Sequence, residues 1–188
     1  MDQPRGFTLI ELVVAIAIIG ILTSLAIPSF KDMFVNMNVR STAESFSLGL
    51  QLARSEAVKR NSRTSFTFSS TGRWEVCGSV STTPGDPCPA GSSISIKRSS
   101  EAGQSVVVTP TPATATMSVF TGLGRQYTDA TAALNNPDGT PQLTSVDFTS
   151  PAYSSPATQK TYRVIVSSAG SVKLCDPSLP TGNARACS

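Results

Sequence analysis

A long apolar run near the start of the chain limits the possible folds more than any other feature. Between Phe7 and Ile27 the one ionisable side chain is Glu11, and the other residues are mostly Leu, Ile, Val and Ala. About 20 apolar residues are enough to cross a bilayer as a helix, so we expect Phe7–Ile27 to span a membrane. A lone carboxylate in hydrocarbon is costly and usually has a partner, which makes Glu11 a candidate functional residue.

The polar stretch before this run, Met1–Gly6, does not fit an ordinary secretory signal. In such a signal the apolar region is shorter and the cleavage site follows it. Here the expected cut lies between Gly6 and Phe7, ahead of the apolar run. Cleavage there would leave the hydrophobic helix on the mature protein.

The residues around that cut, Gly6-Phe7-Thr8-Leu9-Ile10-Glu11, closely resemble the class III signal of type IV pilins and pseudopilins. The resemblance implies that a prepilin peptidase cuts after Gly6 and methylates the new amino terminus at Phe7. It also implies that Glu11 neutralises the terminal amine of a neighbouring subunit during filament assembly. A simple membrane anchor is the alternative, but apolarity alone would require neither Gly6 nor Glu11.

Helical periodicity continues beyond Pro28, which we expect to bend the helix without ending it. Apolar residues recur at three- and four-residue intervals from about Ser29 to Arg60 and predict an amphipathic second half. As one rod, Phe7–Arg60 would be about 80 Å long. The expected inward face consists of Phe30, Met33, Phe34, Met37, Ser41, Phe46, Leu50, Ala53 and Ala57.

Basic residues gather where this helix is expected to end. Cations are favourable near a helix C-terminus, and this is the preferred interpretation of the cluster. A patch for phosphate is the alternative. The cluster comprises Arg54, Lys59, Arg60 and Arg63.

After Asn61 the pattern changes to period two, which predicts a β-rich head without internal repeats. The expected strands are Thr64–Phe68, Arg73–Cys77, Ser93–Arg98, Ser105–Thr109, Met117–Phe120, Leu143–Ser150, Tyr162–Ser167 and Ser171–Cys175. Ser81–Ser93 and Thr128–Gln142 are expected as loops, and Gly122–Arg125 as a turn. The link Pro110–Pro112 cannot lie in a central strand. The chain therefore divides into a leader (1–6), a transmembrane and assembly half of the helix (7–28), an amphipathic half (29–61) and a head (62–188).

The cysteines form two local pairs in the sequence. The chain has no His and no Cys-x-x-Cys, which argues against a zinc site. Two disulfides in an oxidising compartment are the better interpretation, although four cysteines leave the connectivity open. We favour the local pairs Cys77–Cys88 and Cys175–Cys187, with buried free thiols as the alternative.

The composition indicates an extracellular, β-rich protein that is not an enzyme. Charged residues make up only 14 % of the chain, and the net charge of +3 does not by itself predict nucleic-acid binding. Without His there is no Ser-His-Asp or Cys-His nucleophile and no imidazole base. No Gly-rich phosphate loop is present, and nothing singles out a Ser–Lys dyad. We therefore expect no metal and no cofactor.

Two further stretches narrow the resemblance. Gln51–Asn61 resembles the helix end of the GspH/FimT family of minor pilins and pseudopilins, and the tail from Arg163 to Cys187 resembles its FimT/FimU branch. The resemblance implies an α+β type IV pilin fold, in which a long N-terminal helix packs on an antiparallel β-sheet domain. That pilin architecture agrees with the helix-then-strand pattern of the sequence.

The same resemblance implies function, location and partners. The chain would be a minor type IV pilin that helps to initiate or cap pilus assembly. Its partners would be other major and minor pilins, the prepilin peptidase and the inner-membrane assembly platform. It would cross the inner membrane once before it enters an extracellular pilus. The alternative within this class is a GspH-type pseudopilin of a type II secretion system, in a periplasmic pseudopilus.

A second class of function is DNA binding for natural transformation. FimT-type pilins are similar to one another in a C-terminal Gly-Arg-x-Arg segment that binds DNA, and here Gly170-Ser171-Val172-Lys173 stands at that place. Lys can contact a phosphate but lacks the fork geometry of Arg. The candidates for contacting double-stranded DNA are Lys173, Arg185 and Arg163, and binding through so few cations would be weak and salt-sensitive. Ordinary solvated strand charges are the alternative.

Overall fold

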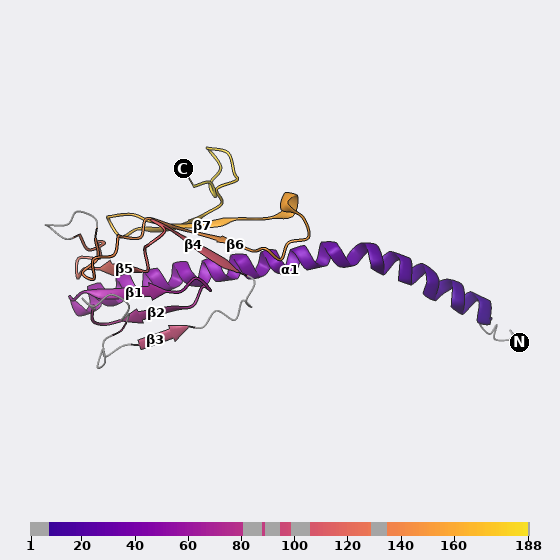
Figure 1. The fold of residues 1–188 in the computed structure, drawn as a ribbon, viewed down its shortest axis with the longest axis horizontal. Coiled ribbons are helices and arrows are strands. Elements are labelled where there is room, and N and C mark those ends of the chain that lie inside the picture. Colours follow the sequence, from indigo (N-terminus) through magenta and orange to yellow (C-terminus); the bar gives the residue numbers. More distant parts are fainter. Residues whose placement is uncertain (1–7, 81–87, 89–94, 99–105, 129–134, 188) are drawn as a thin grey trace, which may run out of the picture.

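One long helix organises the molecule, and its C-terminal half is covered by a β head while its N-terminal half extends alone (Figure 1). The computed structural model describes residues 8–80, 88, 95–98, 106–128 and 135–187. Helix α1 runs from Leu9 to Arg60 over 52 residues. At 1.5 Å per residue this corresponds to roughly 80 Å, and Pro28 lies within the helix without ending it.

Both ends of α1 are closed by local hydrogen bonds. The side chain of Thr8 is the N-cap and accepts the backbone N–H of Glu11 at 3.4 Å. Asn61 is the C-cap in a left-handed conformation (φ 48°), and its N–H reaches the carbonyls of Ala57 and Val58. Thr and Asn suit these two places because one accepts the free N–H groups of the first turn and the other tolerates positive φ.

The head consists of two four-stranded antiparallel sheets, both in contact with α1. The first sheet has the order β3 (Ser95–Arg98), β2 (Trp74–Cys77), β1 (Thr64–Phe68), β5 (Met117–Phe120). The second has the order β4 (Val107–Thr111), β6 (Ser145–Thr149), β7 (Tyr162–Val166), β8 (Val172–Cys175). A short 3-10 helix, η1 (Pro156–Thr158), precedes β7. The predicted combination of a long helix and antiparallel strands is confirmed, with two sheets in place of one.

Strand β4 differs from the strand predicted there. It runs through Pro110, which pairs with Val146 of β6, whereas the prediction ended at Thr109. Proline is accommodated because β4 is an edge strand of its sheet. On the side away from β6 no strand of this sheet needs the backbone N–H that proline lacks. Of the predicted loop Ser81–Ser93 only Cys88 belongs to the described residues, and the start of the predicted strand at Ser93 lies outside them. The predicted loop Thr128–Gln142 is described except for residues 129–134, and within it Asn135 forms an isolated bridge with Pro141.

The inward face of α1 was predicted correctly only in its second half. Phe46, Leu50, Ala53 and Ala57 are fully buried, but the predicted Phe30, Met33, Phe34 and Met37 are 54–63 % exposed. Met37 and Phe46 are separated by about two and a half helical turns and so lie on opposite sides of the helix. Toward the N-terminus, the buried side of the helix instead consists of Ala43, Val39 and Val35.

Asp32 of α1 forms hydrogen bonds with the segment of the head that precedes β7. Its Oδ1 accepts the backbone N–H of Ser154 at 2.7 Å, and its Oδ2 accepts the hydroxyl of Thr158 at 2.7 Å. The N–H of Ser154 is the largest cause of a pKa for Asp32 below its usual value of 3.8. Hydrogen bonds to the charged carboxylate favour ionisation, so this contact depends on pH.

We expect the Asp32 contact to weaken in acid only below the ordinary pKa of an aspartate. A lowered folded-state pKa gives stability that is complete above pH 3.8 and is lost as pH falls through the still lower folded value. The measurement is the NMR chemical shift of the Ser154 amide during an acid titration. Asp32→Asn should remove this titration, while a midpoint at or above 3.8 in the native chain would contradict the assignment.

Candidate functional site

The N-terminal half of α1 carries Glu11 on a stretch of helix that no described part of the chain covers. Every described side chain from Thr8 to Ser24 is exposed, including the large apolar ones. Glu11 lies in the first turn of the helix, and no cation pairs with it among the described residues. An anionic side chain is favourably placed in the first turn of a helix, next to its positive N-terminal end. A carboxylate in that place can also form an ion pair with a cation of another molecule.

The residues predicted for processing lie outside the described part, because Gly6 and Phe7 precede it. The same holds for Phe7 as the start of the predicted membrane span Phe7–Ile27. Within residues 8–80 and the other described segments, no helix is both long and apolar enough to cross a membrane.

Farther along α1, a second group of exposed apolar side chains lies between residues 30 and 37. We call Phe30, Met33, Phe34 and Met37 the outer stripe. It faces away from the buried stripe of Val35 and Val39, so the head cannot cover it. A contiguous apolar strip of this kind marks a surface that binds another apolar element.

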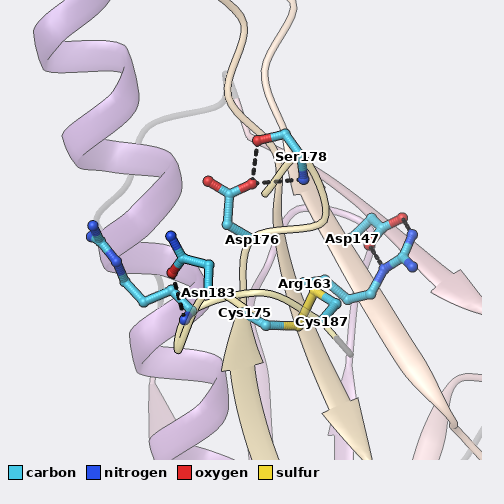
Figure 2. Close-up of a disulfide and its surroundings, with 8 residues drawn as sticks. Asp147, Arg163, Cys175, Asp176, Ser178, Asn183 and Cys187 are labelled. Atoms are coloured by element: carbon cyan, nitrogen blue, oxygen red, sulfur yellow. Dashed lines mark hydrogen bonds and ion pairs between the residues drawn. A yellow bond between two sulfur atoms is a disulfide. The ribbon is translucent and has the colours of Figure 1, made fainter. Parts of the chain in front are cut away.

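The second candidate surface is the outer face of the sheet that contains β7 and β8. Arg163 pairs with Cys175 and Ile165 with Lys173 across these strands, so Arg163 and Lys173 point to the same face. Figure 2 shows Arg163 turned toward Asp147 of β6. Their side chains form two hydrogen bonds of 2.6 and 2.7 Å.

This ion pair changes what Arg163 offers to a ligand. The Asp147 carboxylate is the main cause of a pKa for Arg163 above its usual value. The Nε and one Nη of the guanidinium, which form one of its bidentate edges, already bind the carboxylate of Asp147. Of the three predicted DNA contacts, Arg163 is thus electrically compensated within the protein.

Arg185, the third candidate, lies in the tail that Cys175 and Cys187 close by a disulfide with a Cα–Cα distance of 5.0 Å (Figure 2). Asp176 N–H donates to the carbonyl of Arg185 at 2.8 Å, and Asn183 Oδ1 accepts the N–H of Arg185 at 3.0 Å. The backbone of Arg185 is therefore fixed, while the residue as a whole is exposed.

The other disulfide joins Cys77 of β2 to Cys88. Glu75 lies beside it, with the carboxylate and both sulfur atoms within 4.8 Å of one another. Sulfur atoms bonded to each other are not thiolates and do not serve as metal ligands. This cluster gives no reason to propose a metal centre.

The basic residues at the end of α1 make contacts within the protein. Arg54 Nε donates to the carbonyl of Gly124 at 2.9 Å, and Glu56 pairs with Lys59 (3.6 Å) and Arg60 (3.1 Å). The guanidinium of Arg63 lies 4.3 Å from the ring centre of Tyr127. These contacts favour the structural interpretation of the cluster over a phosphate patch.

The turn predicted at Gly122–Arg125 meets this cluster, which sequence reasoning missed. Thr121 and Arg125 bond through their backbones at 2.9 Å, and Gly124 has positive φ (72°). Gly122 packs against Asn61, the C-cap of α1. The available signal was the pair of glycines, which permit a close approach of one backbone to another.

Two models of known protein families match the sequence of this chain. The family model of the type II transport protein GspH matches residues 42–170, well over half of the chain. The chain belongs to the GspH family. A prokaryotic N-terminal methylation motif matches residues 1–27, the region of Glu11. The fold class and the family expected from the sequence are confirmed.

Individual relatives of this GspH-family protein match it mainly over a short stretch. A fimbrial protein of Moraxella nonliquefaciens is 42 % identical over 60 residues, or 32 % of this chain and 37 % of the relative. A fimbrial protein of Pseudomonas aeruginosa is 40 % identical over 58 residues, or 31 % and 37 %. The matched segments thus span little more than a third of these curated relatives. Among solved structures, the type IV minor pilin FimU of Pseudomonas aeruginosa covers 79 % of this chain and 97 % of its own, at 19 % identity and a TM-score of 0.45.

Proposed function

We propose that this GspH-family protein is a minor pilin that helps to initiate or cap a type IV pilus. The observation that carries the proposal is the uncovered apolar surface of α1, which comprises the described side chains of residues 9–24 and the outer stripe, with the carboxylate of Glu11 in the first turn. So much apolar surface needs a partner, and copies of similar helices in a filament supply one.

The same surface supports a location. In the precursor, Phe7–Ile27 holds the chain in the inner membrane as a single span, with the leader 1–6 still attached. The prepilin peptidase removes the leader after Gly6 and methylates Phe7. During assembly the helix leaves lipid for the filament interior, where Glu11 offsets the desolvation of a neighbour's terminal ammonium and the ammonium does the same for Glu11.

We expect Glu11→Ala to block entry into filaments without preventing membrane insertion. The substitution removes the one group that can neutralise an ammonium in apolar surroundings, and breaking such a buried pair costs about 3–5 kcal/mol. The measurement compares the chain in sheared filaments with the chain in membranes. Thr23→Ala is the matched control, because Thr23 lies on the same exposed part of α1 and its hydroxyl donates to the carbonyls of Ile19 and Gly20 in the preceding turn of the helix.

Two results would count against this proposal. Normal recovery of Glu11→Ala in sheared filaments would refute the role of the carboxylate. Recovery of the native chain only in a periplasmic fraction, never in surface filaments, would favour the alternative of a GspH-type pseudopilin in a type II secretion system.

DNA binding for transformation is the second candidate function. It is supported by two exposed cations, Lys173 on the outer face of β8 and Arg185 on the adjoining tail. We expect at most weak binding that disappears as salt rises, because few phosphates are contacted. A titration of the full chain with double-stranded DNA tests this, with Lys173→Ala and Arg185→Ala as variants. Binding that neither variant weakens would exclude this surface.

A further inference from the structure

The far end of the head carries an apolar projection surrounded by cations, which the helix-based assembly described above does not use. We define the distal surface as Val58, Lys59, Arg63, Leu123, Arg125 and Tyr127. Leu123 is 82 % exposed and Val58 is 51 % exposed. Gly124, between Leu123 and Arg125, packs against Val58, and Arg63 stacks on Tyr127, so these residues form one surface.

Leu123 is held in a turn that is fixed on several sides. Arg54 donates to the carbonyl of Gly124 at 2.9 Å, and Gly124 N–H donates to the carbonyl of Thr121 at 2.8 Å. The neighbouring Gln126 N–H bonds to the carbonyl of Ser168 in the turn between β7 and β8, at 3.1 Å. An apolar side chain on a turn that is already ordered in the free protein loses little entropy on binding, which favours its use in an interface.

The charges around Leu123 indicate the partner. Lys59 approaches Glu56, whereas Arg63 and Arg125 have no ion pair among the described residues. A partner must therefore offer an apolar pocket with carboxylates at its rim. DNA fits less well, because a phosphate backbone has no use for Leu123 and Val58, and the ring of Tyr127 is covered by Arg63 where a base would stack.

We propose that the distal surface docks a second pilin subunit, which receives Leu123 in an apolar pocket lined at its edge by Asp or Glu. The inference rests on the proposed function as a filament subunit. Glu11 and Val58 lie roughly 70 Å apart along α1. The proposed contact at the distal surface is therefore separate from the one at Glu11. It lies at the end of the molecule that faces away from the membrane.

Photo-crosslinking in the bacterium that makes the protein tests the proposal. A photoreactive phenylalanine replaces Leu123 in the full chain, and the adducts are identified by mass spectrometry. We expect one defined adduct with another pilin, at a segment that contains Asp or Glu. The control position is Val107, an apolar side chain of 45 % exposure on the edge strand β4. Adducts with DNA, no adduct, or the same adducts at both positions would each overturn the proposal.

Charge reversal provides the second measurement. Leu123→Asp and Arg125→Glu should each lower recovery in sheared filaments by about tenfold or more, while Arg125→Lys keeps most of it. Membrane levels should not change, because both residues are exposed. Unchanged recovery of Leu123→Asp beside a blocked Glu11→Ala would overturn the distal interface and leave the filament role intact. Normal recovery of Glu11→Ala would instead count against that role.

Discussion

Phe46→Ala should destabilise the head by about 3–5 kcal/mol, the usual cost of removing a buried Phe. Phe46 is fully buried on α1, and its ring centre lies 4.8 Å from that of Phe66, 5.1 Å from that of Phe68 and 5.1 Å from that of Phe148. Phe66 and Phe68 belong to β1 and Phe148 to β6, so one side chain joins the helix to both sheets. Its loss leaves a cavity where three layers meet.

The measurement is denaturant unfolding of the full chain in detergent, followed by tryptophan fluorescence. Trp74 reports on the same region, because its ring centre lies 5.6 Å from that of Phe66. Leu48→Ala is the matched control, two residues away on the same helix but 58 % exposed. A similar loss of stability in both variants would mean that Phe46 does not have the central role assigned to it.

The local elements of this fold follow from the sequence because their signals are local. Thr8 at one end of α1 and Asn61 at the other are capping residues in the places where caps are found. The hairpin of β1 and β2 was predicted to within one residue, since alternating side chains and a turn with Gly72 determine it.

The phase of the outer stripe and the contacts of the charged residues could not be predicted in this way. Phe30 and Val35 are both apolar at helical spacing, and only the surface that the sheets present decides which one is buried. The pairing of Arg163 with Asp147 depends on the register of β6 with β7, across a connection that includes η1. This long-range pairing places the Asp147 carboxylate beside Arg163, a cation that the sequence alone suggests as a DNA contact.

Gly170→Ala should also destabilise the head strongly, by about 3 kcal/mol or more, from the combination of backbone strain and overlap. Gly170 has φ +82°, and an added Cβ would overlap the carbonyl oxygen of Gly124 and lie 3.1 Å from its carbonyl carbon. Both neighbours are backbone atoms that Arg54 holds in place, so they cannot give way as a flexible side chain would.

Gly139→Ala separates the two causes. Gly139 has the same φ of +82°, but no atom of the described residues lies within 4 Å of an added Cβ, so the variant carries only the strain of about 1–2 kcal/mol. Unfolding of both variants in denaturant gives the difference, which we assign to the contact between Gly124 and Gly170. Equal losses would show that the turns do not press on each other. A larger loss at Gly170 would mean that the Gly opening Gly170-Ser171-Val172-Lys173 is required for packing, whether or not the segment binds DNA.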